Sequence, residues 1–205
     1  MSGAGGPVDL DKLFADVIAN AQKAEERAAL EKIKAGQDDI KLEAEHVKDP
    51  DSEEEVLKKQ EDPKGIAAIT SLKIPQKVKL ALFGNKVIRA ILIRDTNRQI
   101  PLFVLQNGRI TEAEIIDFAR NANLNEHVYR RIAGNSSWTR SYSVKLNLVM
   151  NAKVPGDISL KFLSYLHEKD VQRVARSKNV SGLVAGQARK IIEKKEKKAK
   201  GPEGH

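Results

Sequence analysis

The stretch Leu148-Val149-Met150-Asn151-Ala152-Lys153-Val154-Pro155 contains the end of one apolar helix and the start of the next. Asparagine tolerates the left-handed backbone in which many helices end, so Asn151 is a natural stop. Proline suits a first helical turn, because an amide there has no partner within the helix. The stretch therefore predicts two helices joined by a short turn.

Similar helix starts and stops recur along the chain. Ile74-Pro75, Ile110-Thr111 and Val154-Pro155 each pair a β-branched residue with one that favours a helix start. Each start is followed by an apolar helix face, then by a second and a third helix, which makes about nine helices. Asparagine recurs beyond the apolar helix ends, at Asn85, Asn107, Asn135, Asn151 and Asn179.

The second helices share a valine two residues before an arginine. These arginines are Arg89, Arg130 and Arg173, which lie 41 and 43 residues apart. Such spacings fall within the roughly 40 to 47 residues of HEAT and armadillo units. Residues 74 to 192 thus resemble the HEAT/armadillo-like α-helical repeat families, and residues 148 to 155 look like the junction of bacterial leucine-rich-repeat variants. The resemblance implies an all-α fold, an α-solenoid of about three three-helix repeats, that acts as a binding scaffold.

The composition agrees with helices packed through aliphatic side chains, because hydrophobic residues make up 40% of the chain and aromatic residues only 4%. The chain has no cysteine, which excludes a disulfide framework and a thiolate zinc site and favours a cytoplasmic location. It also has no signal-like start and no apolar run approaching ~20 residues, so we expect no membrane span.

Charge is distributed unevenly. Residues 1–62 carry 17 acids and 9 bases, a net charge of −8, whereas residues 63–205 carry 11 acids and 27 bases, a net charge of +16. We expect residues 1–65 to form an acidic, mostly disordered arm with a short amphipathic helix near 10–21. The repeat domain is expected over 66–193 and a Lys-rich tail over 194–205. The arm could mask the basic part of the chain. Its candidate motif for a partner's groove is Leu10, Phe14, Val17 and Ile18.

The arginine series supplies the candidate binding residues. Each arginine lies about 200° around its helix from the preceding valine, and equivalent positions of a solenoid stack into a ladder. The basic face would contain Arg89, Arg130 and Arg173, with Arg131 and Arg176 nearby. It would bind carboxylates or phosphates of a protein partner. Sequence-independent binding of DNA or RNA is the alternative function. In a structural alternative, the arginines brace neighbouring repeats through acids such as Asp95, Glu126 and Asp170.

No motif favours catalysis. The chain contains no Walker loop, no Gly-x-Gly-x-x-Gly fingerprint and no nucleophile elbow, so we expect no catalytic residue, no cofactor and no enzyme activity. The histidines, including His46, form no metal-ligand motif and are expected on the surface. Trp138, Tyr142 and Tyr165 could stack on nucleobases, but packing is the expected role. The sequence therefore predicts a protein-protein interaction scaffold.

Overall fold

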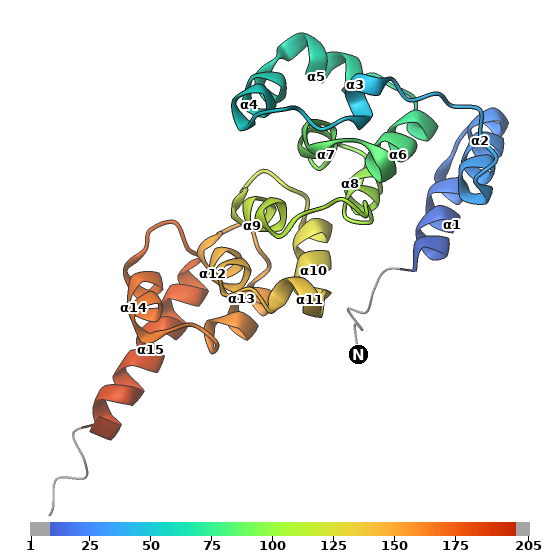
Figure 1. The fold of residues 1–205 in the computed structure, drawn as a ribbon. Coiled ribbons are helices and arrows are strands. Elements are labelled where there is room, and N and C mark those ends of the chain that lie inside the picture. Colours follow the sequence, from blue (N-terminus) through green and yellow to red (C-terminus); the bar gives the residue numbers. More distant parts are fainter. Residues whose placement is uncertain (1–8, 200–205) are drawn as a thin grey trace, which may run out of the picture. The chain divides into compact units, whose positions relative to one another are not determined.

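The fold was described from a computed structural model, which covers residues 9–199 and the side chains of residues 9–197. This part of the chain contains fifteen helices and no strand (Figure 1), which confirms the all-α class. It divides into two compact units, one ending at Thr111 and the other beginning at Glu112. The division lies inside residues 66–193, which we expected to form one domain.

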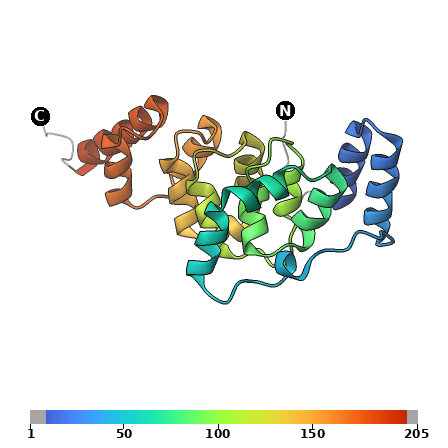
Figure 2. The same cartoon turned by 90° about the horizontal axis from the view of Figure 1, so that it is seen from above.

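The N-terminal unit contains eight helices. α1 packs on α2, and α2 packs on α6, which also contacts α3, α7 and α8. α4 and α5 both pack on α7. Figure 2 shows α1 and α2 side by side, with α6 next to them. The helices are α1 (Leu10–Asn20), α2 (Ala24–Ala35), α3 (Ala44–Val47), α4 (Glu53–Glu61), α5 (Pro63–Thr70), α6 (Ile74–Phe83), α7 (Lys86–Leu92) and α8 (Ile100–Val104).

The N-terminal segment is folded from residue 9 onward, so the mostly disordered arm predicted for residues 1–65 is not confirmed. Residues 1–8 lie outside the described part of the chain. Leu13, Phe14 and Val17 of α1 are buried, as are Leu30 and Ile33 of α2. Apolar residues are few in this segment, but their spacing gathers them on one face of each helix, where they pack instead of remaining in water.

Opposite charges explain why such an acidic segment stays on the rest of its unit. Residues 63–111 carry nine bases and one acid, a net charge of +8 against the −8 of residues 1–62. Lys79 pairs with Asp38, and Arg109 pairs with Asp49. Acids of residues 1–62 are thus paired with bases of residues 63–111 in the same unit, whereas masking of the arginine series stays a prediction.

The C-terminal unit contains the remaining seven helices. α12 packs against α9, α13 and α14, and α15 packs against α13 and α14. α15 runs through the start of the expected Lys-rich tail, whereas residues 200–205 lie outside the described part. The helices are α9 (Glu112–Arg120), α10 (Glu126–Gly134), α11 (Ser136–Thr139), α12 (Tyr142–Met150), α13 (Gly156–Leu163), α14 (Glu168–Arg176) and α15 (Gly182–Ala199).

The three predicted helix starts are confirmed. α6 begins at Ile74, α9 begins directly after Thr111, and α13 begins directly after Pro155. From α6 to α15 there are ten helices, one more than three three-helix repeats would contain, and the four-residue α11 is the shortest of them. Local start signals thus placed helices correctly, because capping depends on residues adjacent in sequence.

The asparagines end helices in part as predicted, because Asn135 and Asn151 are the C-caps of α10 and α12, but their backbone is extended and not left-handed. No described residue other than Gly36 has a positive φ, so none of the described asparagines ends a helix in a left-handed conformation. Asn85, Asn107 and Asn151 are instead buried, and their side-chain amides donate to main-chain carbonyls near the end of an earlier helix. Asn85 reaches Glu45 and Lys48, Asn107 reaches Ala81 and Gly84, and Asn151 reaches Ala119 and Asn121, at 2.7 to 3.1 Å.

Candidate functional site

The structure buries two of the five candidate arginines. Arg89, in α7, is only 2% exposed and donates from Nη1 to the carbonyl oxygen of Gly84 at 3.0 Å. Arg131, in α10, is 8% exposed, and burial lowers the pKa of its guanidinium. Helical phase predicted that Arg89 faces away from the apolar side of α7 and is exposed. This was wrong because α7 is contacted by α4, α5, α6 and α8, so the side of the helix opposite Val87 is covered as well. Neither arginine is accessible to a partner in this structure.

Arg130 is exposed, but it is bound to two carboxylates of its own unit. It donates to Glu126 Oε1 at 2.7 Å and to Asp157 Oδ2 at 2.9 Å. The hydrogen bonds to Glu126 and to Asp157 raise the pKa of Arg130, and the bond from Arg130 lowers the pKa of Asp157. Asp157 belongs to α13, so Arg130 links α10 to α13, as the bracing alternative expects.

Arg173 and Arg176 lie together on α14, at the edge of an open hollow of about 480 Å³. Lys169 lies four residues before Arg173, and Arg176 three residues after it, so all three share one helix face. The nearest carboxylate oxygen to Arg173 is Asp170 Oδ1, at 3.8 Å. The hollow is lined by Met150, Lys169, Gln172, Arg173, Arg176 and Ser177, none of which is acidic. Its lining therefore holds three cations and no carboxylate, and the carboxylate of Asp170, which pairs with Arg173, lies outside the lining.

The aromatic residues of this unit differ in exposure. The Tyr142 ring stacks on His167, with centroids 4.4 Å apart, and its hydroxyl donates to Asp170. Burial, together with the bond to Asp170, raises the pKa of Tyr142. Tyr142 thus has a packing role, and Trp138 is half-buried. Tyr165 is 61% exposed, with Lys145 Nζ 5.8 Å from its ring centroid.

The candidate partner-binding motif on α1 packs against helices of its own N-terminal unit. Phe14 and Val17 are buried, and the Phe14 ring meets Phe103 of α8 edge-on, with centroids 5.0 Å apart. Leu10 is 41% exposed and Ile18 is half-buried. The apolar face of α1 is therefore covered by α8 and α2, and it is not presented to a partner's groove.

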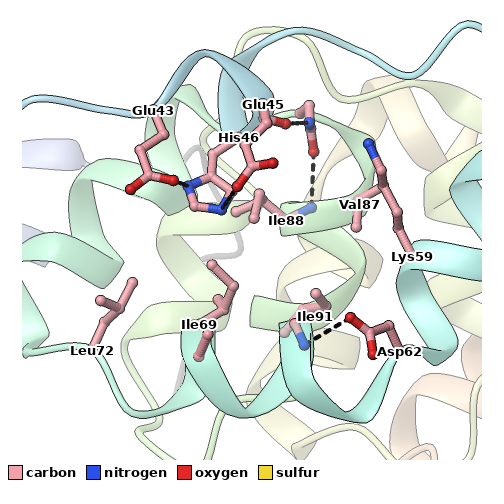
Figure 3. Close-up of a pocket in the computed structure, with 13 residues that line it drawn as sticks. Glu43, Glu45, His46, Lys59, Asp62, Ile69, Leu72, Val87, Ile88 and Ile91 are labelled. Atoms are coloured by element: carbon pink, nitrogen blue, oxygen red, sulfur yellow. Dashed lines mark hydrogen bonds and ion pairs between the residues drawn. The ribbon is translucent and has the colours of Figure 1, made fainter.

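A second hollow, which we call the His46 cavity, lies in the N-terminal unit and has a volume of about 380 Å³ (Figure 3). Its polar lining includes Glu43, Glu45 and His46 from the α3 region. Sequence reasoning misses this cavity, because it predicts a disordered segment here and a surface position for His46. The remaining lining comes from α4, α5, α7 and adjoining residues: Lys59, Asp62, Gly65, Ala68, Ile69, Leu72, Asn85, Val87, Ile88 and Ile91.

The rim of the His46 cavity is held in place by Asn85, the N-cap of α7. Its side-chain amide donates to the carbonyl oxygens of Glu45 and Lys48, at 2.7 and 2.8 Å. Its main-chain amide donates to the carbonyl oxygen of His46 at 2.8 Å, and its Oδ1 accepts from the amide of Ile88 at 3.1 Å. The four-residue helix α3 is thus fixed to the start of α7 by its own backbone.

Glu43, Glu45 and His46 form a cluster of three side chains that could hold a metal ion. Each offers a ligand atom, and these atoms lie within 4.8 Å of one another. The carboxylate of Glu43 lies 3.8 Å from Nδ1 of His46, whereas that of Glu45 lies 3.5 Å from Nε2. One ring nitrogen and one oxygen of each carboxylate are therefore close enough to face a single ion. The three residues supply at most three protein ligands, and both carboxylates are largely exposed, as is common for acidic groups that hold no ion.

Comparison of the chain with protein-family models, with curated proteins and with solved structures finds no match. Within the described helices, none combines the length and the apolar character needed to cross a membrane.

Proposed function

We propose that this chain is a non-enzymatic binding protein whose C-terminal unit holds an acidic segment of a partner protein. The single observation that carries the proposal is the hollow beside α14, lined by Lys169, Arg173 and Arg176 without an acidic residue. Guanidinium groups bind carboxylates through two parallel hydrogen bonds, which gives both energy and orientation. A protein that serves as an adaptor or scaffold would use such a surface to capture its partner.

The charge of the C-terminal unit supports this proposal. Residues 112–205 carry 10 acids and 18 bases, a net charge of +8, which equals the net charge of the whole chain. Residues 1–111 carry 18 acids and 18 bases and are neutral overall. A basic unit attracts an acidic partner before contact and raises the rate of association, most strongly at low salt.

The lining of the hollow favours a peptide over a nucleic acid. Met150 and Gln172 offer an apolar contact and an amide beside the three cations. Proteins that bind single strands without sequence preference stack bases on aromatic side chains, and no aromatic residue lines this hollow. The chemistry of the lining therefore suits a carboxylate-bearing peptide better.

Sequence-independent binding of DNA or RNA is the second candidate, and it has one specific observation in its favour. Helix α15 carries exposed lysines at Lys190, Lys194, Lys195 and Lys197. Such a series could neutralise several backbone phosphates, and the resulting affinity would fall steeply with salt concentration.

Fluorescence anisotropy with two labelled probes tests the proposal. A short Glu-rich peptide should bind at low salt, and Arg173→Gln combined with Arg176→Gln should weaken that binding about tenfold. The matched control is Arg120→Gln combined with Arg140→Gln, which removes the same charge from exposed sites of the same unit. Equal losses in both double variants would contradict the proposed site. Tighter binding of a random single-stranded DNA than of the peptide would favour the second candidate.

A further inference from the structure

The His46 cavity combines an apolar floor with an acidic rim. Figure 3 shows Glu43 and Glu45 on either side of His46 at one edge of the cavity, with Ile69 and Ile91 across from them. Its volume of about 380 Å³ is within the range of small-ligand pockets, roughly 300 to 1,000 Å³. We propose that this cavity binds a small organic cation with an apolar body, such as an alkylammonium ion.

The two glutamates are the charged groups that remain able to take a cation. The ammonium of Lys59 lies 2.8 Å from Glu55 Oε1, outside the cavity lining. The carboxylate of Asp62 accepts from the main-chain amides of residues 64 and 65, because it caps α5. Glu43 and Glu45, by contrast, form ion pairs within 4 Å only with His46 in the described part of the chain, and their side chains are 72% and 68% exposed. Lys59 lies far enough away to act on Glu45 through charge alone.

The rim remains negative in either protonation state of the imidazole. With His46 neutral, Glu43 and Glu45 carry two negative charges, and with His46 protonated, one negative charge remains. An anionic ligand would therefore meet repulsion at this edge, whereas an ammonium group could form charge-assisted hydrogen bonds to a carboxylate. The negative net charge of the rim therefore favours a cationic ligand over an anionic one.

The floor of the cavity selects an apolar body for the same ligand. Ile69 of α5 is 4% exposed, and Ile88 and Ile91 of α7 are 2% and 8% exposed. A ligand that covers these side chains would remove its own apolar surface from water, at roughly 25 cal/mol per Å². An inorganic cation would gain nothing from this floor.

The rim of the His46 cavity is fixed in place by hydrogen bonds of the protein itself. Asn85 ties the backbone of Glu45, His46 and Lys48 to the start of α7 through three hydrogen bonds. Binding therefore needs little ordering of the rim, and less of the interaction energy is lost to conformational entropy.

Ligand-observed NMR titration of the full chain with three probes of one shape tests the proposal. These probes are n-hexylammonium, n-hexanol and n-hexanoate. The ammonium should bind about tenfold more tightly than the alcohol, because a charge-assisted hydrogen bond adds to the same apolar contact. The hexanoate should bind most weakly.

Two variants and one control make the test specific. Glu43→Gln combined with Glu45→Gln should reduce the affinity for n-hexylammonium to that for n-hexanol, while the affinity for the alcohol stays the same. The control, Glu31→Gln combined with Glu54→Gln, removes equal charge from exposed positions outside the lining. Ala68→Phe, at an exposed lining position of α5, should weaken all binding by filling the cavity.

Several results would overturn the proposal. They are equal affinities for the three probes, equal losses in the control double variant, no binding of the ammonium, or unchanged binding in Ala68→Phe. Displacement of n-hexylammonium by equimolar Zn²⁺ would assign the rim to a metal ion instead. None of these results depends on the C-terminal unit, so they leave the proposed function unaffected.

Discussion

The side-chain amide of Asn85 donates a 2.7 Å hydrogen bond to the carbonyl oxygen of Glu45, forty residues earlier in the chain. This bond joins the acidic N-terminal segment to the start of α7 and positions one edge of the His46 cavity. Asn107 and Asn151 make equivalent bonds to the ends of α6 and α9. Three of the five recurring asparagines therefore connect one helix to the end of an earlier one.

Replacing Asn107 should destabilise the N-terminal unit. Its buried side-chain amide donates to the carbonyl oxygens of Ala81 and Gly84, and Asn107→Ala would leave both without this partner. We expect a loss of about 2 to 3 kcal/mol in the free energy of unfolding, measured by urea denaturation. The control is Asn20→Ala, whose side chain is exposed and bonds only within α1. A loss no larger than that of the control would refute the connecting role.

Truncating Phe14 tests whether the N-terminal segment is part of the folded unit. Phe14 is 3% exposed and packs edge-on against Phe103, so Phe14→Ala should cost about 3 to 5 kcal/mol in unfolding free energy. The measurement is chemical denaturation of the full chain. Leu57→Ala, at a side chain that is 58% exposed, is the control and should change stability little. An unchanged midpoint in Phe14→Ala would instead support a disordered arm.

Phe162 and Leu160 should differ in their contribution to the stability of the C-terminal unit. Phe162 is 4% exposed, whereas Leu160 is half-buried on another side of α13. Phe162→Ala should therefore cost about 3 to 5 kcal/mol, and Leu160→Ala clearly less. Thermal denaturation followed by circular dichroism compares the two. Equal losses would mean that Leu160 is buried as deeply as Phe162, contrary to this structure.

The ion pair between Arg130 and Asp157 should appear as a pH effect of known sign. The hydrogen bond from Arg130 lowers the pKa of Asp157 below the ordinary value, about 3.9 for an aspartate. This stabilisation is complete above the unfolded-state pKa and is lost as pH falls through the lower folded-state pKa. Both side chains are largely exposed, so we expect a contribution of roughly 0.5 kcal/mol or less.

An NMR titration of the Asp157 carboxyl carbon measures that shift directly. Arg130→Gln should return the pKa of Asp157 toward its ordinary value, because the donor and its charge are both removed. Arg120→Gln, which removes an exposed arginine paired with Asp117, serves as the control. A pKa of Asp157 that is unchanged in Arg130→Gln would contradict the bracing role of this arginine.

The sequence by itself determined the features that depend on neighbouring residues. Aliphatic periodicity predicted the all-helical class, and the starts at Ile74, Thr111 and Pro155 were placed within one residue of the observed helix starts. These predictions succeed because capping and helical periodicity are local properties of the chain. The apolar face of α1 was identified in part: Phe14 and Val17 are buried, whereas Leu10 is 41% exposed and the buried Leu13 was missed.

Only the tertiary structure decided what covers each face. Arg89, Arg130 and Arg173 stand at the same position after a valine, yet the first is buried, the second is paired across two helices, and the third lines an open hollow. Helical phase gives the direction of a side chain but not the packing partner that lies in that direction. For the same reason, sequence reasoning missed two features: the folded state of the N-terminal segment and the His46 cavity. Both depend on contacts such as that of Asn85 with Glu45, which join residues far apart in the sequence.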